Sequence, residues 1–240
     1  MADLQGRERA HYVRDMFERI AGRYDLMNRL MTFGQDRRWR RYVIQQARLD
    51  SDALLLDVAT GTGDIAQEGL RQHPDITVVG LDFAPTMMTV GRDRLGRRKI
   101  LWCDGDAINL PFPDSHFDAA VSGYLMRNVI DVPRAFREQM RVVKPSGWIV
   151  TLDTTPPPPN LLRPFILIHL RFVIPLLGRL IAGDDSAYSY LPESTEGFKT
   201  PEELATIMRD VGLQEVSFRR FMFGTMAVHM GRRPQAEEAG

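Results

Sequence analysis

The sequence predicts a doubly wound α/β fold, in which a mostly parallel seven-stranded sheet carries helices on both faces. Short apolar runs alternate with helical segments through the middle of the chain and predict parallel strands with crossover helices. A glycine-rich turn directly after the first run predicts a ligand-binding junction between a strand and a helix. The two final extended segments lie too close together for a crossover helix, so they predict an antiparallel C-terminal hairpin.

Residues 1–50 predict extra N-terminal helices that precede the sheet. Apolar side chains recur there at three- and four-residue spacing, which places them on one helix face: Val13, Phe17, Ile20, Tyr24 and Met27. Asp36 is expected to cap a following helix that contains Trp39, Val43 and Ala47. We assign this region to a helical extension that acts as a lid.

Residues 51–153 form the predicted α/β core. Its strands are expected at the five apolar runs 53–58, 77–82, 99–103, 117–122 and 147–153. Helical segments separate most of these runs, including 65–72 and 132–143. This alternation places helices on both faces of the sheet.

Four prolines at 156–159 end the regular structure of the core. We expect residues 154–199 to form a helical insertion and lid on the substrate side, and residues 200–233 to complete the sheet. Thr200 as N-cap, Pro201 in the first turn and Glu203 three residues after Thr200 predict a helix that ends near Gly212. The last two strands are expected at 215–221 and 225–231.

The composition excludes several classes of protein. The chain has 31 basic and 31 acidic residues and a formal net charge of zero, so no overall field favours nucleic acid. Cys103 is the only cysteine, which excludes an intrachain disulfide and favours a reducing, cytoplasmic compartment. The most apolar stretch, 160–183, is interrupted by Arg163, Arg171 and Arg179 and is too broken for a membrane-spanning helix. Peripheral contact with the inner face of a membrane stays open.

The glycine-rich turn, which contains Asp57, Gly61, Thr62 and Gly63, follows a predicted strand and opens a predicted helix. Glycine lets the backbone turn tightly and approach a ligand closely. The spacing satisfies the loose dinucleotide-binding pattern, although an ordinary strand-to-helix turn also fits it. Asp82 ends the next predicted strand, where its carboxylate can accept both hydroxyls of a ribose. Asp82 therefore favours an adenosine ligand without choosing between NAD and S-adenosyl-L-methionine (SAM).

The segment after the third predicted strand distinguishes these two cofactors. Asp106 and Ala107 are followed by the motifs LPF and FD, and this order resembles class I SAM-dependent methyltransferases, which have a Rossmann-like fold. The resemblance implies that Asp106 meets the adenine amino group beside the Ala107 backbone, and that Ser122 or Gly123 contacts the cofactor. No Tyr-x-x-x-Lys pair supports a nicotinamide cofactor, so SAM is expected.

Two more specific segments narrow the match. Residues 17–28, which end in YDLMN, and the RNV segment at 127–129 resemble the menaquinone/ubiquinone biosynthesis C-methyltransferase family. Residues 144–147 and 190–194 resemble further signatures of that family, so the resemblance spans residues 13–232. It implies methylation of a ring carbon of a prenylated quinol, most specifically the conversion of demethylmenaquinol to menaquinol.

Alternatives remain for the reaction. Met126, Ser146 and Lys199 depart from the usual family pattern and leave the quinone open. The first alternative is that the substrate is a ubiquinone precursor instead of a naphthoquinol. Other class I enzymes methylate oxygen or nitrogen of small molecules, and a non-catalytic nucleotide-binding module would share the same fold.

The resemblance also implies three catalytic residues. Arg127 would hold the substrate anion, because a guanidinium stays charged and donates parallel hydrogen bonds. Asn128 would orient a quinol oxygen, and Tyr24 would line or close the site. The competing interpretations are a surface arginine, a turn residue and a core aromatic, respectively. Asp153 and His116 are the candidates for the base. The other histidines show no metal-ligand spacing, so no metal is expected.

A prenylated substrate resides in a membrane, and two segments bear on contact with it. Residues 161–181 and the N-terminal helices are expected to form an apolar lid. Residues 37–41 contain four arginines and Trp39, and could meet anionic lipid with the tryptophan at the interface. The competing interpretation, a solvated helix face whose tryptophan packs inward, is favoured. The oligomeric state is left open.

Overall fold

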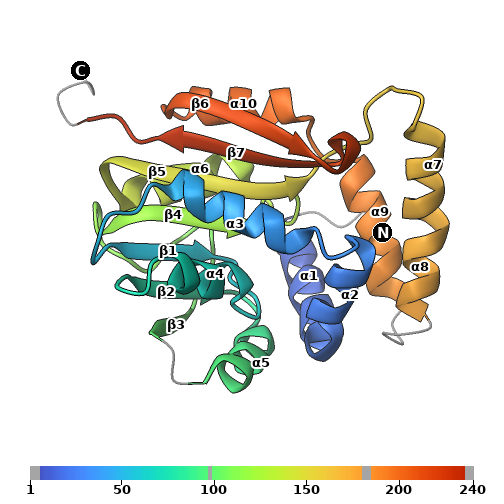
Figure 1. Cartoon of the computed structure of the whole chain (residues 1–240), viewed down its shortest axis with the longest axis horizontal. Helices are drawn as coiled ribbons and strands as arrows, with labels where there is room; N and C mark the ends of the chain where they lie inside the picture. Colours follow the sequence, from blue (N-terminus) through green and yellow to red (C-terminus); the bar gives the residue numbers. More distant parts are fainter. Residues whose placement is uncertain (1–5, 97–98, 180–184, 236–240) are drawn as a thin grey trace.

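The computed structural model describes residues 6–96, 99–179 and 185–235. Within these residues, seven strands form one sheet in the spatial order β3-β2-β1-β4-β5-β7-β6 (Figure 1). Their bounds are β1 Leu54–Val58, β2 Thr77–Asp82, β3 Ile100–Asp104, β4 Phe117–Gly123, β5 Val143–Thr154, β6 Gln214–Phe221 and β7 Met226–Arg232. The predicted doubly wound sheet is confirmed.

The strand directions confirm the predicted mixture of parallel and antiparallel pairs. β1 is parallel to β2 and β4, β2 to β3, and β4 to β5, whereas β7 is antiparallel to both β5 and β6. β5 begins earlier than predicted because Val143 already pairs with Phe117, before a register shift that precedes Ala119. The carboxyl ends of β1 to β5 therefore lie at one edge of the sheet, where ligands bind in open α/β folds.

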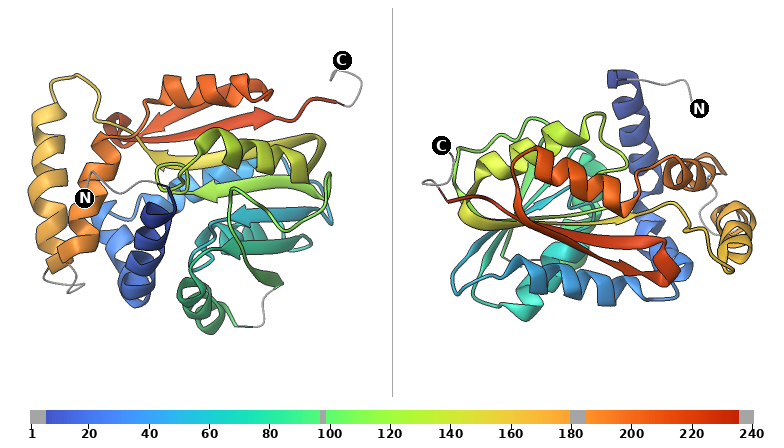
Figure 2. Two further views of the ribbon diagram at one scale, coloured as in Figure 1. Left: turned by 180° about the vertical axis from the view of Figure 1, so that it is seen from behind. Right: turned by 90° about the horizontal axis from the view of Figure 1, so that it is seen from above.

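Helices cover both faces of the sheet (Figure 2). α3 and α4 pack on one face, and α6 and α10 on the other. Each face has its own hydrophobic core. In β4, Ala119 and Val121 belong to the core under α3 and α4, and Ala120 belongs to the core under α6 and α10, because successive residues of a strand point to opposite faces. The bounds of these helices, and of α5 beside β2, are α3 Asp36–Ala47, α4 Asp64–Gln72, α5 Pro85–Leu95, α6 Val132–Val142 and α10 Pro201–Asp210.

The predicted start of α10 is confirmed in detail. Thr200 Oγ1 accepts a hydrogen bond from the Glu203 backbone N–H at 3.3 Å. The Glu203 carboxylate in turn accepts one from the Thr200 backbone N–H at 2.7 Å. This reciprocal capping satisfies two backbone donors that the first helical turn leaves free.

The N-terminal region is helical but not continuous. It forms α1 Gly6–Ile20, the 3-10 turn η1 Ala21–Arg23 and α2 Tyr24–Met31. The predicted apolar face is buried at Val13, Ile20 and Met27 and half-buried at Phe17 and Tyr24. α1 and α2 lie beside the carboxyl edge of the sheet, so this face packs at the ends of the strands (Figure 1).

Asp36 does not cap α3, contrary to the prediction. It is the first residue of the helix, after Gln35 at the N-cap position, and it is fully buried. Its carboxylate accepts hydrogen bonds from Thr32 Oγ1 at 3.3 Å and Arg40 Nη1 at 2.7 Å. The arginine one turn later draws the carboxylate inward, away from the helix N–H groups. Trp39 is only 1% exposed and packs in the core, so it does not face lipid.

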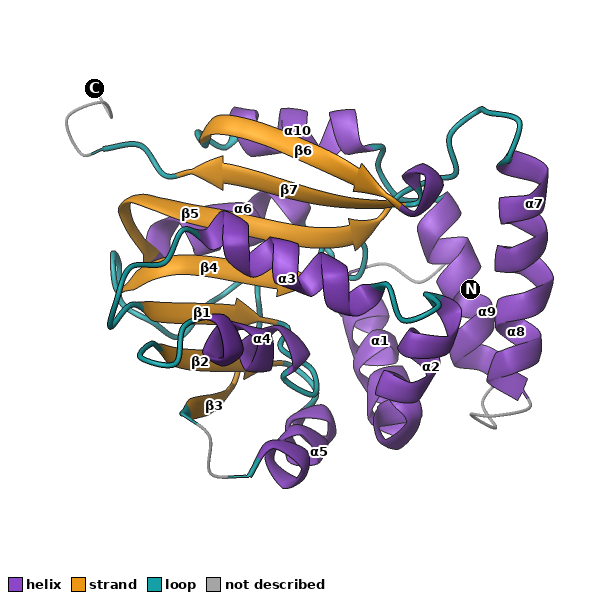
Figure 3. Cartoon of the chain, in the orientation of Figure 1, coloured by secondary structure: helices purple, strands orange, loops and turns teal. Residues whose placement is uncertain are grey.

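The insertion between β5 and α10 forms a helical layer beside the strand ends (Figure 3). Its elements are α7 Arg163–Ile168, the π-helix η2 His169–Val173, α8 Ile174–Leu177 and α9 Asp185–Glu196. No helix in the described ranges is both long and apolar enough to span a membrane. Positions 180 and 181 of the predicted lid lie outside those ranges.

Candidate active site

The turn between β1 and α4 depends on left-handed backbone conformations. Gly61 and Gly63 have φ angles of 57° and 81°, which glycine adopts without steric cost. A Cβ atom on Gly63 would lie 2.7 Å from Cη2 of Trp102, so any side chain at this position would have to displace Trp102. The turn thereby brings the Gly61 backbone to the carboxyl edge of the sheet.

Asp57 supports this turn from beneath. Its Oδ2 accepts hydrogen bonds from Thr60 Oγ1 at 2.7 Å and from the Ala66 backbone N–H at 3.1 Å. Burial raises the pKa of Asp57 to about 7, because desolvation outweighs these hydrogen bonds. Asp57 therefore holds the turn together rather than facing the space above it.

Asp82 lies at the end of β2 and faces that space. Its Oδ2 accepts a hydrogen bond from the Gly61 N–H at 2.7 Å and its Oδ1 one from the Ala84 N–H at 2.8 Å. Burial raises the pKa of Asp82 to about 6. Each oxygen of a carboxylate can accept a second hydrogen bond. Asp82 is therefore held by the backbone with acceptor capacity left for a pair of neighbouring hydroxyls.

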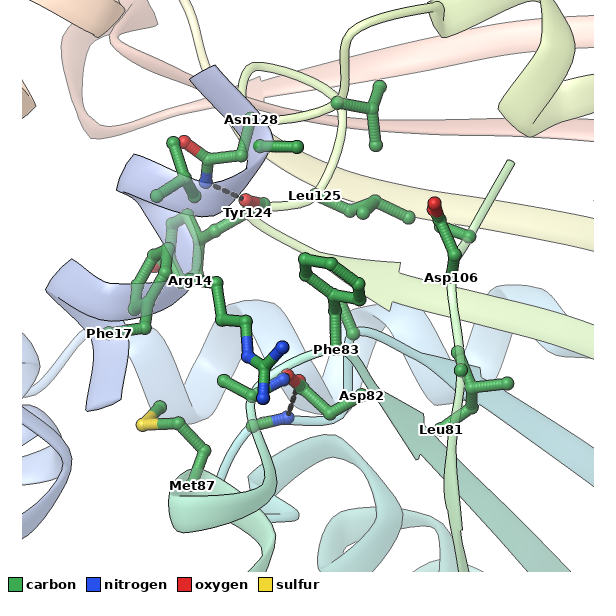
Figure 4. Close-up of a pocket in the computed structure, with 18 of the residues that line it drawn as sticks. Arg14, Phe17, Leu81, Asp82, Phe83, Met87, Asp106, Tyr124, Leu125 and Asn128 are labelled. Carbon is green, nitrogen blue, oxygen red and sulfur yellow. Dashed lines mark hydrogen bonds between the residues drawn. The ribbon is translucent and has the colours of Figure 1, made fainter. Parts of the chain in front are cut away.

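A cavity of about 860 Å³ lies above these groups, and we call it the strand-end cavity. Segments from α1, α2, the glycine turn and the ends of β2, β3 and β4 line it. Figure 4 shows Phe83 in its middle, beside Asp82 and Leu125. The Arg14 guanidinium from α1 lies 5.3 Å from the centre of the Phe83 ring. The cavity thus combines a flat apolar surface with a buried carboxylate, as an adenosyl group requires.

The predicted cofactor residues divide into two groups. The strand-end cavity is lined by Gly61, Asp82, Asp106, Ala107 and Gly123. The residues outside its lining are Asp57, Thr62, Gly63 and Ser122. The Ser122 side chain is buried beside its partner on the neighbouring strand, where its Oγ donates to Thr151 Oγ1 at 3.0 Å. Gly123, the last residue of β4, lines the cavity through its backbone because the cavity lies at the carboxyl end of the strand.

Sequence reasoning missed Phe83, Tyr124 and Arg14, although it expected the N-terminal helices to act as a lid. Phe83 and Tyr124 each directly follow a residue that ends a strand and lines the cavity. That position was the signal that could have found them. Arg14 had no comparable signal, since only the packing of α1 brings it to Phe83.

A second cavity, of about 1180 Å³, adjoins the first, and we call it the apolar chamber. Most of its lining is apolar and comes from α2, α7, η2, α8 and the short turn η4 Met222–Gly224. Tyr124 lines both cavities and so forms part of their shared wall. Its φ of 60° is unusual for a residue other than glycine, and its N–H is held by the Leu152 carbonyl at 2.7 Å. Such backbone strain is common at functional sites.

Arg127 lines the apolar chamber and is only 7% exposed, so it is not a surface arginine. Its Nη1 donates to Thr154 Oγ1 at 3.0 Å, and its backbone N–H donates to Asp153 Oδ2 at 3.2 Å. Its guanidinium lies 5.1 Å from the centre of the Tyr124 ring. Burial raises the pKa of Asp153 and the Arg127 charge opposes that rise. The arrangement places a fixed positive charge at the wall between the two cavities.

Tyr24 and Asn128 both line the strand-end cavity, whereas Arg127 does not. Burial raises the pKa of Tyr24, although the Asn28 side chain and the Arg127 charge act against it. Asn128 already uses both ends of its amide: Nδ2 donates to the Tyr124 carbonyl at 2.7 Å, and Oδ1 accepts from the Tyr190 hydroxyl at 3.1 Å. Asn128 is therefore built into the wall of the site.

The two candidates for the base lie in different places. His116 precedes Phe117, the first residue of β4, and is exposed. It is therefore about 20 Å from the cavity at the other end of that strand. Asp153 contacts Arg127 but lines neither cavity. Among the described residues, no group of three or more His, Cys, Asp or Glu side chains could hold a metal ion.

A network of ion pairs joins the N-terminal helices to the glycine turn. Asp25 on α2 accepts from Thr62 Oγ1 and from Arg94 Nη1, both at 2.7 Å. Asp64 at the start of α4 lies 2.5 Å from both Arg94 Nη2 and Arg40 Nη1. Sequence reasoning missed this network, because its members come from segments far apart in the chain. It holds α2 over the turn.

Comparisons with known proteins give the family. The model of the ubiE/COQ5 methyltransferase family matches residues 5–233. The ubiquinone/menaquinone biosynthesis C-methyltransferase UbiE of Desulfotalea psychrophila is 47% identical, with 91% of this chain and 89% of the relative covered. The demethylmenaquinone methyltransferase of Thermus thermophilus is 42% identical, with 91% and 100% covered.

Solved structures with the same fold are more distant. Phosphoethanolamine N-methyltransferase 2 of Haemonchus contortus, in complex with SAM, has a TM-score of 0.63 at 13% identity and covers 82% of this chain and 53% of its own. The [4+2]-cyclase SpnF has a TM-score of 0.64 at 19% identity and covers 83% and 81%. An enzyme named as a cyclase on this fold illustrates that these likenesses establish the fold alone.

The strand-end cavity fits SAM on independent grounds. Asp82 has acceptor capacity for the ribose hydroxyls, and Phe83 supplies an apolar face beside it. Gly61 brings a bare backbone to the same place. Together with the family match over nearly the whole chain, this geometry shows that the chain belongs to the ubiE/COQ5 methyltransferase family and is a SAM-dependent methyltransferase.

Proposed function

We propose that the enzyme methylates a ring carbon of a prenylated quinol, and that its substrate is demethylmenaquinol. The observation that carries the proposal is the apolar chamber, which meets the strand-end cavity at Tyr124 and contains the buried guanidinium of Arg127. Relatives at 40% and 42% identity bear the name demethylmenaquinone methyltransferase. A chamber with apolar walls and one charged end suits a ring that carries oxygens and an isoprenoid tail.

The residues of the chain have a defined task in this reaction. Bound SAM supplies an electrophilic methyl group on a positively charged sulfur. The ring carbon becomes a nucleophile when a neighbouring hydroxyl loses its proton, so the site must stabilise an oxygen anion. Arg127 can do so because it is buried, permanently charged and held in place by Thr154 and Asp153. Asn128 and the Tyr24 side chain line the strand-end cavity, where the methyl group of SAM must reach the quinol ring.

The other substrate classes are less well supported. O- or N-methylation of a polar small molecule does not explain a chamber of this size with mostly apolar walls. A non-catalytic module does not explain a guanidinium buried beside it. A ubiquinone precursor would use the same groups, and the name of the Desulfotalea relative includes both quinones.

A direct assay separates the two quinols. Purified enzyme is incubated with methyl-labelled SAM and either demethylmenaquinol or a demethylated benzoquinol, and the mass and methyl position of each product are determined. We expect carbon methylation of demethylmenaquinol, with a higher kcat/KM than for the benzoquinol. A preference for the benzoquinol would overturn the choice of substrate, and product from neither would overturn the proposed function.

We also propose that the mouth of the apolar chamber rests on a membrane. Phe33, Phe165 and Phe223 line the chamber and are 76%, 70% and 70% exposed, so they join its interior to the surface. Arg29 and Arg37, on either side of Phe33 in the chain, are exposed as well. Exposed aromatic side chains beside arginines suit the interface of an anionic bilayer. This contact differs from the one suggested by Trp39, which is buried.

Sedimentation with vesicles tests this contact. Wild-type enzyme should sediment with vesicles that contain anionic lipid, and replacement of Phe33, Phe165 and Phe223 by Ser should reduce the bound fraction several-fold. The matched control is Leu101→Ser, because Leu101 is 60% exposed on β3 and lines neither cavity. Equal loss of binding in the control, or no binding of the wild type at low salt, would exclude the proposed contact.

A further inference from the structure

A third cavity, of about 1010 Å³, lies between α2, α3 and α4, and we call it the arginine groove. It shares no lining residue with the strand-end cavity or the apolar chamber. Among the described residues, its lining contains two carboxylates and five guanidinium groups, which belong to Arg29, Arg37, Arg40, Arg41 and Arg71. The whole chain has a formal net charge of zero, so this excess of three positive charges is a local feature.

Both carboxylates of the groove are already engaged. Asp64 Oδ2 lies 2.5 Å from Arg40 Nη1, and the side chains of both residues are mostly buried. Glu68 accepts two hydrogen bonds from Arg71, one from Nε at 2.7 Å and one from Nη2 at 2.6 Å. These pairs form the floor and one wall of the groove. They leave little negative charge for the other three arginines.

Arg29, Arg37 and Arg41 are exposed and lack a close carboxylate. Within the part of the chain that the structure describes, the guanidinium groups of Arg29 and Arg37 form no ion pair or hydrogen bond. Arg41 Nε lies 3.8 Å from Glu68 Oε1, which is beyond hydrogen-bond distance. A guanidinium can donate two parallel hydrogen bonds to phosphate oxygens. Three such groups around one groove therefore suit a phosphate group.

One turn of the chain joins the groove to the mouth of the apolar chamber. Arg29 and Arg37 stand on either side of the turn that carries Phe33, and the Gly34 N–H at this turn donates to the Arg29 carbonyl at 2.8 Å. Phe33 lines the chamber and is 76% exposed. An apolar ring and two guanidinium groups thus lie within a few residues of one another. A phospholipid has the matching parts, because its phosphate lies beside its apolar chains.

We propose that the arginine groove binds the phosphate group of an anionic phospholipid. The inference rests on the proposed membrane contact and adds a defined headgroup site to it, and it does not depend on which quinol is methylated. Nucleic acid carries phosphates as well, but the described lining of the groove includes no aromatic side chain on which a base could stack. The adjoining Phe33 favours a ligand with apolar chains.

The test measures binding of short-chain phosphatidylglycerol, a soluble anionic phospholipid, by calorimetry at low salt. Replacement of Arg29 and Arg37 together by Gln should weaken binding by roughly 10- to 30-fold, because two of the free guanidinium groups are lost. Replacement of both by Lys keeps the charge but removes the parallel donors, so binding should weaken several-fold. The matched control replaces Arg134 and Arg137 by Gln, because both are exposed on α6, on the other face of the sheet.

The control and the Lys variant separate a shaped site from an effect of charge alone. An equal loss of binding in the control would show that only net charge matters and would overturn the inference. Full binding by the Lys variant would reduce the groove to a diffuse charged surface, with the same consequence. Inorganic phosphate is the second probe. If it binds as tightly as phosphatidylglycerol, the ligand is a free phosphate and the lipid is excluded.

Methylation of demethylmenaquinol in detergent keeps this inference apart from the proposed function. The Gln variant should retain wild-type kcat/KM and Tm, because Arg29 and Arg37 line neither of the other cavities. A fall in kcat/KM at unchanged Tm would assign these arginines to the reaction and overturn the headgroup site. A wild type that methylates the quinol but does not bind phosphatidylglycerol would overturn this inference alone. A wild type that binds the lipid in the groove but methylates no quinol would support the site and overturn only the proposed function.

Discussion

The Thr62 hydroxyl donates a hydrogen bond to Asp25 Oδ1 at 2.7 Å, which joins the glycine turn to helix α2. Arg94 on α5 reinforces the connection, with Nη1 on Asp25 and Nη2 on the Thr62 carbonyl at 2.9 Å. The same helix carries Tyr24 and Asn28 to the two cavities. Asp25 therefore links the position of the glycine turn to that of the α2 residues that line the two cavities.

Arg94→Ala should weaken SAM binding. The variant leaves Asp25 without its cation and frees α2 from the turn, so we expect a Kd about 10-fold higher, equivalent to about 1.4 kcal/mol. Calorimetry with SAM measures the effect. Arg71→Ala is the matched control, because Arg71 is exposed and its pair with Glu68 lies outside both cavities. Similar Kd values for the two variants would show that the connection does not affect the cofactor.

Arg127→Ala should abolish most turnover while SAM still binds. Loss of a preorganised charge at a developing anion typically lowers kcat by roughly 10²- to 10³-fold. Because the Ala variant also leaves Asp153 buried without a cation, Arg127→Lys serves as the second variant, with the charge retained but not the planar guanidinium. Single-turnover rates and SAM affinity are measured separately. Turnover near the wild-type value in both variants would remove Arg127 from the mechanism.

Gly63→Ala should destabilise the protein more than a comparable glycine replacement elsewhere. Both Gly63 and Gly34 have positive φ, at 81° and 71°, so an alanine at either costs about 1–2 kcal/mol of backbone strain. Only Gly63 also has Trp102 within 2.7 Å of the new Cβ, which adds an overlap worth about 1–3 kcal/mol. Denaturant unfolding of the two variants measures the difference. Equal free energies of unfolding would mean that Trp102 moves aside freely.

Asp57 and Asp82 should each contribute less to the stability of the cofactor-free enzyme as pH rises from about 4 to about 7. Burial raises the pKa of Asp57 to about 7 and that of Asp82 to about 6. A carboxyl whose pKa rises on folding holds its proton more tightly in the folded state. Its stabilising contribution is full below the unfolded pKa of about 4 and is lost as pH passes the folded pKa.

Asp57→Asn tests the share of Asp57 in this pH dependence. The amide stays uncharged, so the gain in Tm relative to the wild type should be larger at about pH 8 than at about pH 5. Calorimetric unfolding at both values measures it. The prediction fails if wild type and variant lose stability in parallel across this range.

The local sequence pattern was sufficient to predict the strands, the helix starts and part of the candidate site. Apolar runs and the Thr200 capping box predicted strands and helix starts because each depends on residues close together in the chain. The glycine turn and Asp82 were predicted for the same reason, since both follow directly from the end of a strand. Asp36 was the exception: its cap position was wrong because Arg40 draws the carboxylate inward.

The sequence by itself determined the sheet, the glycine turn with Asp82, and the family to which the chain belongs. Only the tertiary structure decided that Arg127 is buried, that Gly123 rather than Ser122 lines the cavity, and that Asp25 on α2 is joined to the glycine turn. The physical reason is that burial and hydrogen-bond pairing depend on which distant segments pack together. No local pattern shows which side chains become buried and which form hydrogen bonds when α2, β4 and the helical insertion pack together at the ends of the strands.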